Sequence, residues 1–245
     1  ELAGPFLASM VVLAAASLAT LIWLRPDPRD VGRKMAQKHP EATLYQGPTR
    51  SVLQALGTPA AVVAVLAMAL GQMVMVGVMV ITSVYMRSHQ HSLSHISVVI
   101  AAHSLGMFAF SFLSGRLTDR WGRGQVFVVG AGTLVLACIR APLSADVLPL
   151  SGALFLLGLG WNFCYVGGSA LLSDQLSHAE RAKTQGANEW LLGVATATAS
   201  LGAGLVFALT SFTTIGILGA ALALVPLGLT GWWLIRNRAP VAAWL

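Results

Sequence analysis

The chain has 245 residues, of which 56% are hydrophobic and only 10% are charged. Long uncharged blocks separate the charges, which is typical of helices in lipid and excludes an ordinary soluble core. A formal net charge of +6 and a pI near 10.0 would indicate nucleic-acid binding if the basic residues formed one patch. Because they lie in alternate loops instead, we expect a lipid bilayer as a partner and no nucleic acid.

Apolar segments recur along the whole sequence. At about 1.5 Å per residue, each can cross or nearly cross a hydrocarbon layer about 30 Å thick. We therefore predict an all-α polytopic transmembrane helical bundle with about seven spans, which cover residues 2–24, 59–86, 94–114, 126–143, 147–172, 187–210 and 212–235.

The basic residues are distributed unevenly between the two sides of these spans. Of the 15 Lys and Arg residues, only Arg87 and Arg140 fall in loops on one side, and the others fall in the alternate loops or beyond the last span. Cytoplasmic loops carry an excess of Lys and Arg. We therefore predict a multi-pass protein of the plasma (inner) membrane, with its start outside and its C-terminus in the cytoplasm.

The stretch from 25 to 58 contains several prolines and charges and little apolar periodicity, so we interpret it as a linker. The chain starts with Glu, and its first apolar run lacks the basic region of a signal peptide. We expect a fragment or a processed product. The two cysteines, Cys138 and Cys164, fall inside apolar runs and are expected to be buried free thiols.

A basic stretch over residues 114–125 joins two long apolar runs, and we expect it to form a turn between two helices. Its glycines permit tight turning, and its arginines favour the cytoplasmic side. The stretch resembles the loop signature of the major facilitator superfamily, in which Gly, Leu, Asp, Arg, Gly and Arg recur at fixed spacing. The matching residues are Gly115, Leu117, Asp119, Arg120, Gly122 and Arg123. The departure is Gly124, where Lys or Arg is common.

The resemblance implies a domain organisation. Proteins of this family carry two six-helix halves joined by a long cytoplasmic loop, and the signature often joins the second and third helices of a half. Residues 1–24 would then be the last helix of an N-terminal half, 25–58 the central loop and 59–245 the six-helix C-terminal half. The rest of the N-terminal half would be a partner outside this chain, and the signature residues would gate the cytoplasmic side.

Polar and soft apolar side chains inside the spans are candidates for a substrate cavity. Met75 and Met79 fall on a narrow methionine face with Gln72 at its flank. Such a face suits varied apolar molecules, although methionines also fill contacts between helices. Asn162 and Tyr165 in the fifth span and Thr196 in the sixth complete the candidate set. Amide and hydroxyl groups in a membrane either bind substrate or tie helices together.

Two titratable residues are candidates for a proton relay. His103 lies near the middle of its span, where an ionisable group is costly without water or a partner. A neutral histidine bonded to a nearby carbonyl is the structural alternative. Glu189 falls near the start of the sixth span, where a carboxylate can also act as a helix cap. By the family resemblance, Glu189 would face the signature loop of the missing half.

The chain lacks the motifs of ATP binding, zinc hydrolysis and serine hydrolysis, so we expect no enzyme, no cofactor and no metal. Three histidines, His89, His91 and His95, fall in one short loop, which we interpret as solvated. The sequence predicts a secondary transporter that moves a small organic solute by alternating access, with proton-coupled efflux of a drug-like or amphipathic compound favoured. A nutrient or metabolite importer and a non-transporting sensor or scaffold remain alternatives.

Overall fold

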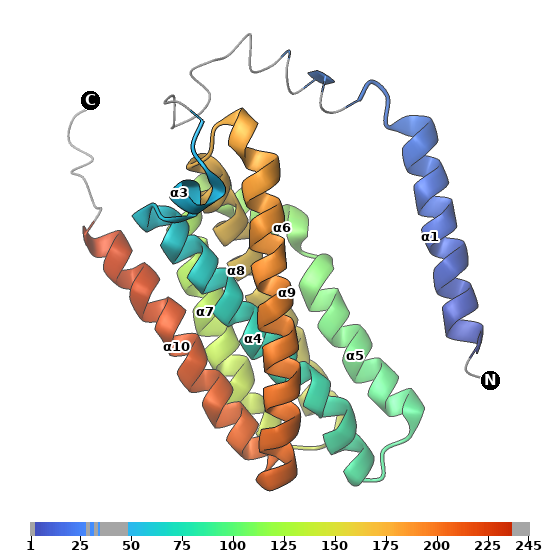
Figure 1. Ribbon diagram of the computed structural model, residues 1–245. Helices are drawn as coiled ribbons and strands as arrows, with labels where there is room; N and C mark the ends of the chain where they lie inside the picture. The colour runs from blue at the N-terminus through green and yellow to red at the C-terminus, as the bar shows by residue number, and fades with distance from the viewer. Residues whose placement is uncertain (1–2, 28–29, 32–33, 35–48, 237–245) are drawn as a thin grey trace. The chain divides into compact units, whose positions relative to one another are not determined.

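Figure 1 shows the computed structural model, which describes residues 3–27, 30–31, 34 and 49–236. The chain divides into two compact units, Glu1–Gly47 and Pro48–Leu245. Most of the predicted linker over 25–58 lies outside the described residues, but its end, from 49, belongs to the second unit.

Helices make up the described chain, and these residues contain no strand. The first unit contains α1 (Ala3–Trp23), which is exposed along nearly all of its described length. The second unit contains, in order, α3 (Val52–Leu56), α4 (Pro59–Ser88), α5 (Leu93–Phe108), α6 (Ser111–Trp121), α7 (Arg123–Arg140), a short 3₁₀ turn (Ala141–Leu143), α8 (Val147–Asp174), α9 (His178–Leu209) and α10 (Phe212–Arg236).

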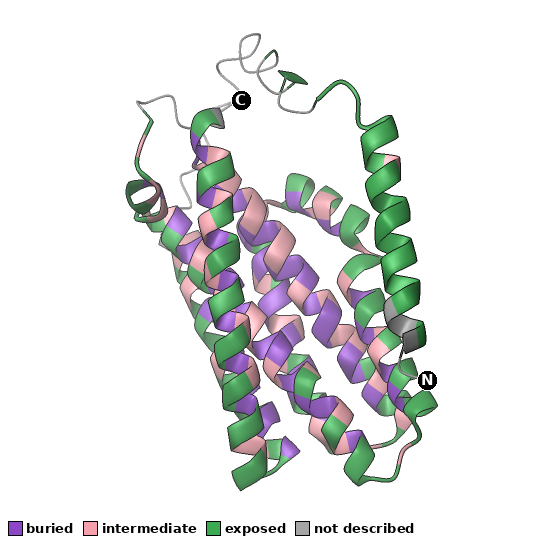
Figure 2. Cartoon of the chain, turned by 45° about the vertical axis from the view of Figure 1, so that its right-hand side comes forward, coloured by how far each residue is buried: buried purple, intermediate pink, exposed green. Residues whose placement is uncertain are grey.

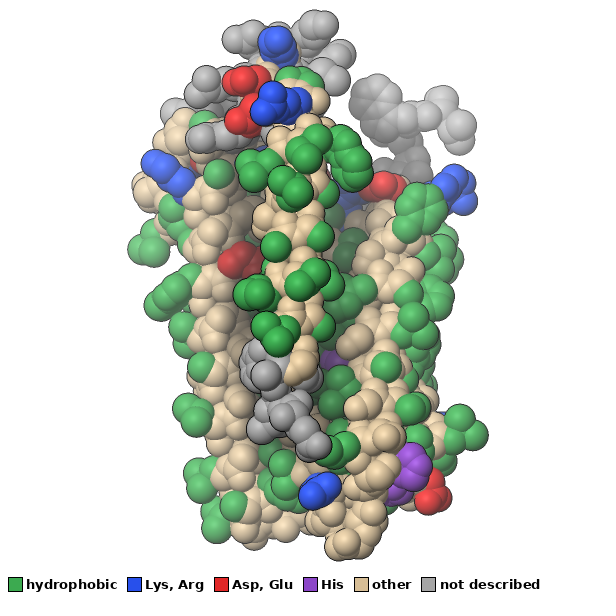
Figure 3. All heavy atoms as spheres, turned by 90° about the vertical axis from the view of Figure 1, so that its right-hand side faces the viewer, with side chains coloured by type: hydrophobic (Ala, Val, Ile, Leu, Met, Phe, Trp, Pro, Cys, Tyr) green, Lys and Arg blue, Asp and Glu red, His purple; other side chains and the backbone are tan. Residues whose placement is uncertain are grey.

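Six stretches of the described helices are long and apolar enough to cross a membrane. They are Pro59–Ser88, Leu93–Trp121, Arg123–Leu143, Val147–Asp174, Ala179–Leu209 and Phe212–Ile235. The apolar part of α1, Leu7–Trp23, is shorter than these. On the face shown in Figure 3, hydrophobic side chains run along the helices, and the charged ones concentrate toward helix ends. The predicted all-α, polytopic bundle is therefore confirmed, with six membrane-length helices in place of about seven.

Helix α8 is the central element of the second unit. It packs against α4, α5 and α7, while α10 packs on α7 and α4, and α9 packs mainly on α4. The buried residues concentrate on these central helices (Figure 2). The apolar core between them includes both free thiols, Cys138 and Cys164, which confirms that the cysteines act as small buried side chains.

Glycines allow α8 to approach α5 closely. A Cβ added to Gly158 of α8 would collide with the carbonyl of His103, and one added to Gly106 of α5 would collide with the carbonyl of Phe155. Small residues let helix backbones pack tightly where lipid supplies no hydrophobic driving force between helices. This contact fixes the position of α8 and of the polar side chains that it carries.

The basic stretch over 114–125 differs from the turn that the sequence predicts. Most of it continues the helix α6, and the chain reverses only at Gly122, whose φ of 99° favours glycine. The predicted span over 94–114 is also interrupted, because α5 ends at Phe108 and α6 begins at Ser111. Gly124, the departure from the family signature, is buried, and a Cβ there would lie 2.6 Å from Leu234 of α10. Helix α10 thus occupies the space that a longer side chain would need.

Helix α9 begins at His178, nine residues before the predicted start at 187. The backbone N–H of Ser177, the residue before the helix, donates to Glu180 Oε2 at 2.9 Å, so the Glu180 side chain caps this end. The expectation that Glu189 caps the helix is therefore wrong, because Glu189 lies well inside α9. The residues between His178 and the predicted start at 187 are mostly polar, so the sequence pattern did not identify them as part of a membrane helix.

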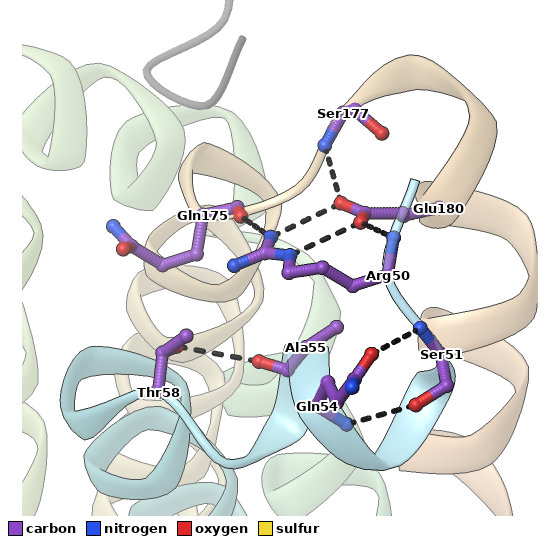
Figure 4. Close-up of polar contacts among 8 residues, drawn as sticks. All are labelled: Arg50, Ser51, Gln54, Ala55, Thr58, Gln175, Ser177 and Glu180. Carbon is purple, nitrogen blue, oxygen red and sulfur yellow. Dashed lines mark hydrogen bonds and ion pairs between the residues drawn. The ribbon is translucent and has the colours of Figure 1, made fainter. Parts of the chain in front are cut away.

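Arg50 clamps the α8–α9 connection (Figure 4). Its guanidinium Nη2 lies 3.0 Å from Glu180 Oε2 and donates to the Gln175 carbonyl at 2.6 Å. The Arg50 backbone N–H donates to Glu180 Oε1 at 2.6 Å. The Glu180 side chain is only 1% exposed, so its charge depends on these donors. The clamp fixes both the end of the linker and the start of α9.

The close contact at Gly158 predicts that alanine substitutions at two glycines of α8 change the free energy of unfolding by different amounts. Gly158→Ala should lower the free energy of unfolding by about 1–3 kcal/mol, because the added methyl group forces α8 away from α5. Gly152→Ala adds a methyl group where nothing lies within 4 Å and should be neutral or slightly stabilising. Unfolding of the purified protein in a denaturing detergent titration measures both. Equal effects would contradict the close packing.

The Arg50 clamp predicts that removal of the Arg50 side chain strongly destabilises the protein. Arg50→Ala should lower the free energy of unfolding by about 3–5 kcal/mol, because it leaves the Glu180 carboxylate buried without its ion pair. Lys183→Ala removes an exposed basic residue from the same region of α9 and should change stability by less than about 0.5 kcal/mol. Thermal unfolding in detergent compares the two variants. Similar melting temperatures for both would show that Glu180 does not depend on Arg50.

Candidate functional site

A hollow of about 450 Å³ lies between α4, α8 and α9, with the end of α5 at its edge. Its volume falls within the range of small-molecule sites, about 300–1,000 Å³. Eight residues line it: Gln72, Phe108, Trp161, Tyr165, Glu189, Leu192, Gly193 and Thr196. We call this hollow the central pocket. It brings together Gln72, Tyr165, Glu189 and Thr196, which the sequence singled out from three different spans.

Gln72 of α4 connects the two other walls of the central pocket. Its side-chain carbonyl accepts a hydrogen bond from Trp161 Nε1 at 2.6 Å, and its amide nitrogen donates to Thr196 Oγ1 at 2.8 Å. A side-chain amide has one acceptor end and one donor end, and here each end is in use. Gln72 therefore sets the orientation of the indole and links α8 to α9 through α4.

Aromatic rings form one wall of the pocket. Trp161 and Tyr165 lie four residues apart on α8, and their rings stack with centroids 5.1 Å apart and planes 20° apart. Phe108 at the end of α5 meets Trp161 edge to face, with centroids 6.4 Å apart. Such pairs are favourable arrangements of ring quadrupoles. The result is an aromatic wall of three rings, in which Trp161 and Tyr165 stack on each other and Phe108 is nearly perpendicular to Trp161.

Glu189 supplies the only charged side chain in the lining of the central pocket. Tyr165 Oη donates to Glu189 Oε1 at 2.8 Å, so the carboxylate lies against the aromatic wall. Among the described residues, no Lys or Arg forms an ion pair with Glu189. Glu189 is exposed and lies on a helix long and apolar enough to cross a membrane, where a carboxylate is uncommon, so it is a candidate functional group.

Polar bridges connect α8 and α9, which are consecutive in the chain. Besides the Tyr165–Glu189 bond, Gln185 Nε2 donates to Ser173 Oγ at 2.9 Å. The Arg50 clamp joins the same two helices at their connection. Helix α9 also packs on α4, which is its main neighbour.

The methionine face belongs to the core and not to the lining of the central pocket. Met75 is 6% exposed and lies in the apolar core, and Met79 packs against that core from its edge. The structure thus places both residues in contacts between helices, where methionine adapts to irregular gaps.

Asn162 lies at the break between α5 and α6 and does not line the pocket. Its amide nitrogen donates to the Met107 carbonyl at 2.7 Å and to Ser111 Oγ at 3.0 Å. Its side-chain oxygen accepts a hydrogen bond from Ser114 Oγ. A break inside a membrane helix exposes backbone groups that lipid cannot satisfy, so a side chain from a neighbouring helix must do so. Asn162 has this function here.

His103 is buried between α5 and α8, at 2% exposure, and lies outside the central pocket. Its Nδ1 lies 3.0 Å from the Leu154 carbonyl. Because a carbonyl oxygen can only accept, Nδ1 carries the hydrogen and the ring ties the two helices together. This is the structural alternative that the sequence left open.

The signature residues lie around the α6–α7 reversal. Arg123 Nε donates to Asp174 at the end of α8 at 2.8 Å, and its Nη1 lies 3.9 Å from Asp119. Gly122 makes the turn itself, whereas Gly115 lies inside α6. Arg123 therefore joins the reversal to α8, and Asp119 remains largely exposed, at 77% for its side chain.

Among the described residues, no group of three His, Cys, Asp or Glu side chains is arranged to hold a metal ion. His95 lies in the first turn of α5 and not in the predicted loop. Its Nδ1 lies 3.5 Å from Nδ1 of His91, and Nδ1 of His89 lies 2.9 Å from the Tyr85 carbonyl. A second hollow of about 270 Å³ lies between α4, α9 and α10, but its lining contains no charged residue.

Some of the residues that line the central pocket were not among those predicted to form a substrate cavity. Trp161 and Tyr165 share a helix face at a spacing of four, which is a signal that could have assigned both to one wall. Phe108 and Gly193 gave no such signal. Phe108 lies at the pocket because α5 ends there, and Gly193 lies there because it follows Glu189 by about one turn of α9.

The fold and the pocket define a class: a polytopic helical membrane protein with a solute-sized pocket between its helices. The family model described as Major Facilitator Superfamily matches residues 62–243. The chain belongs to this superfamily, which confirms the resemblance of the loop signature. Membership points to a transporter rather than an enzyme.

Curated relatives support the same assignment. The uncharacterized MFS-type transporter YddS of Bacillus subtilis (strain 168) is 36% identical over 240 residues, which cover 96% of this chain and 55% of YddS. The riboflavin transporter RfnT of Brucella anthropi is 35% identical, over 92% of this chain and 55% of RfnT. The multidrug resistance protein MdtL of Escherichia coli O139:H28 is 31% identical over 37% of this chain and 23% of MdtL.

The chain spans about half the length of the curated relatives that it matches along most of its length. No solved structure is significantly similar to it.

The hydrogen bonds of Asn162 predict that its replacement destabilises the fold. Asn162→Leu should lower the free energy of unfolding by about 1–3 kcal/mol, because the carbonyl of Met107 loses its donor in an apolar environment. Ser104→Ala, on the exposed face of α5, removes a hydroxyl that bonds only within its own helix and should cost less than about 0.5 kcal/mol. Detergent-titration unfolding of both variants tests this. Equal stability of Asn162→Leu and the parent protein would contradict it.

Proposed function

We propose that the natural protein containing this chain is a secondary transporter that moves a small organic solute across the membrane by alternating access. The central pocket carries this proposal, because it places a carboxylate, an amide and three aromatic rings in one solute-sized hollow between membrane helices. Transporters of this architecture bind substrates between helices near the midplane, and rigid-body rocking exposes the site to each side in turn.

In this proposal, the chain supplies the C-terminal half of the transporter and the last helix of its N-terminal half. Residues 1–24 would form that helix, and 25–58 the central cytoplasmic loop. The pattern of basic residues supports a C-terminus in the cytoplasm and a location in the plasma (inner) membrane. The central pocket would be one wall of the substrate site, and the other half would supply the facing wall.

We place the coupling proton at Glu189. It is the only carboxylate in the lining of the pocket, and Tyr165 Oη donates a hydrogen bond to it. A substrate and a proton that compete for one carboxylate are thereby coupled, because binding of either disfavours the other. His103 does not line the pocket, and its Nδ1 is bonded to the Leu154 carbonyl, so we assign the coupling to Glu189 alone.

We favour export of a drug-like or amphipathic solute in exchange for protons. The aromatic wall and the absence of Lys and Arg from the lining support an apolar or amphipathic solute over an anionic one. The names of RfnT and MdtL show that related chains carry a vitamin or confer drug resistance. Import of a nutrient is the alternative direction for the same site.

The signature residues would gate the cytoplasmic side. The Arg123–Asp174 contact holds the α6–α7 reversal to the end of α8, so rotation of this half would carry the reversal with it. Asp119, which is exposed, would be available to a helix end of the other half.

The transport proposal predicts a specific loss in Glu189→Gln. In proteoliposomes that contain the natural full-length protein, ethidium or riboflavin flux should follow an imposed pH gradient. Glu189→Gln should lower the gradient-driven flux by about tenfold or more, because the side chain keeps its size but cannot exchange a proton. Exchange of the same probe without a gradient should persist.

Asp146→Asn is the matched control, since Asp146 is an exposed carboxylate at the start of α8, far along the helix from the pocket residues. Its flux should equal that of the parent protein. Gradient-independent flux, or a Glu189→Gln protein that still follows the gradient, would contradict proton coupling at Glu189. A folded protein with no flux of either probe would favour a sensor or scaffold.

A further inference from the structure

We propose that His91 and His95 form a binding site for one Zn²⁺ ion at the connection between α4 and α5 (Figure 1). The site lies outside the central pocket, and the inference goes beyond the proposed function without depending on it. The sequence predicts only a solvated loop here, because spacing alone does not show which imidazoles face each other. The structure shows that two of them do.

The two imidazoles have the separation that a zinc ion requires. Nδ1 of His91 lies 3.5 Å from Nδ1 of His95. Zinc binds imidazole nitrogen at about 2.0–2.1 Å in tetrahedral geometry, which separates two ligand nitrogens by about 3.3–3.4 Å. The ring centroids are 5.6 Å apart and the planes are 71° apart, so the rings meet edge to face and do not stack. An ion between the two Nδ1 atoms would therefore require only a small shift of the rings.

The backbone on both sides holds the two rings in this arrangement. After α4, the chain reverses at Gln90, whose φ of 62° is uncommon for a residue other than glycine. The next backbone N–H, that of His91, donates to the Met86 carbonyl at 3.2 Å. Ser92 caps α5, and its Oγ accepts from the backbone N–H of His95 at 3.3 Å. Each histidine is thus fixed by a backbone hydrogen bond of its own.

Both ring nitrogens that face each other are available to an ion. Among the described residues, the contact between His91 and His95 is the only hydrogen bond of either ring. In that contact one Nδ1 carries a hydrogen and the other accepts it. A zinc ion would replace this hydrogen, and both nitrogens would then supply lone pairs. His95 is exposed and His91 is partly exposed, so an ion can reach them from solvent.

His89, in the same connection, is engaged differently. Its Nδ1 lies 2.9 Å from the Tyr85 carbonyl, which can only accept, so this nitrogen carries a hydrogen. Its ring also contacts the Tyr85 ring, with centroids 4.4 Å apart. His89 is therefore assigned to the end of α4 and not to the zinc site, which makes it a matched control.

The ligand set determines the class of ion. Neutral imidazole suits zinc and related transition ions, whereas Mg²⁺ and Ca²⁺ prefer oxygen. Among the described residues, no third His, Cys, Asp or Glu is arranged to complete the group, so water would fill the remaining positions. Two protein ligands make a weaker site than the four of a structural zinc centre, and we expect a Kd of about 1–100 μM.

The first test measures Zn²⁺ binding to the natural full-length protein in lipid nanodiscs. Equilibrium dialysis is carried out at mildly alkaline pH, where a free imidazole is neutral, with excess Mg²⁺ to occupy oxygen sites. His91→Ala and His95→Ala should each weaken the binding of one Zn²⁺ ion by at least about tenfold. His89→Ala should bind Zn²⁺ as the parent protein does.

The second test asks whether the ion joins the connection to the first turn of α5. Amide hydrogen exchange over residues 90–96 should slow by about tenfold at a free Zn²⁺ concentration ten times the Kd, because local opening must release the ion. The same slowing should occur in His89→Ala and should be absent in His91→Ala. Unchanged exchange in the other helices without Zn²⁺ shows that the variants are folded.

Two results would overturn the inference. One is Zn²⁺ binding of equal number and affinity in the parent protein, His91→Ala and His95→Ala, which would mean that the pair only shares a hydrogen. The other is a loss in His89→Ala as large as in the other two variants, which would contradict the assignment of the ligands. Both readouts are independent of solute flux, so failure of the transport proposal leaves them decisive.

Discussion

The hydrogen bonds across the central pocket are the interactions on which the account of this protein depends. Tyr165 donates to Glu189, and Gln72 joins Trp161 to Thr196, so α4 meets the consecutive helices α8 and α9 through polar side chains. In a membrane, polar groups of this kind are retained only where they have partners or a function. Here they have partners, and one of them is a carboxylate for which the described residues supply no cation.

The rest of the fold holds these side chains in position. Helix α8 carries Trp161 and Tyr165, and its close contact with α5 at Gly158 and Gly106 leaves it little freedom to shift. Asn162, one residue after Trp161 and so about 100° further around α8, satisfies the break between α5 and α6. The Arg50 clamp fixes the start of α9, and Glu189 follows nine residues later on the same helix. The pocket therefore combines a rigid wall on α8 with a helix that is joined to it by polar bridges.

The sequence alone was sufficient for the class of fold, because long apolar segments and alternating basic loops are imposed by the bilayer itself. It also gave Gln72, Tyr165, Glu189 and Thr196, since polar residues inside spans are few. It could not distinguish these pocket residues from Asn162 or His103. A polar side chain in a span can bind either a solute or a backbone carbonyl, and which of the two it binds depends on the helix that faces it. It also misplaced the start of α9, where the polar turn after Ser177 looks like a loop but is stabilised by Glu180 and Arg50.

The central claim is that the pocket lies on the path of the solute, and one labelling measurement tests it most directly. Gly193 lines the pocket, and a Cβ there would have no atom within 4 Å, so Gly193→Cys places a thiol in it without a clash. The natural Cys138 and Cys164 are buried and give a low background. In oriented vesicles with the natural full-length protein, the account predicts that a membrane-impermeant thiol reagent labels this cysteine from either side. A cysteine that is labelled from neither side, in a protein that is folded, would contradict the account.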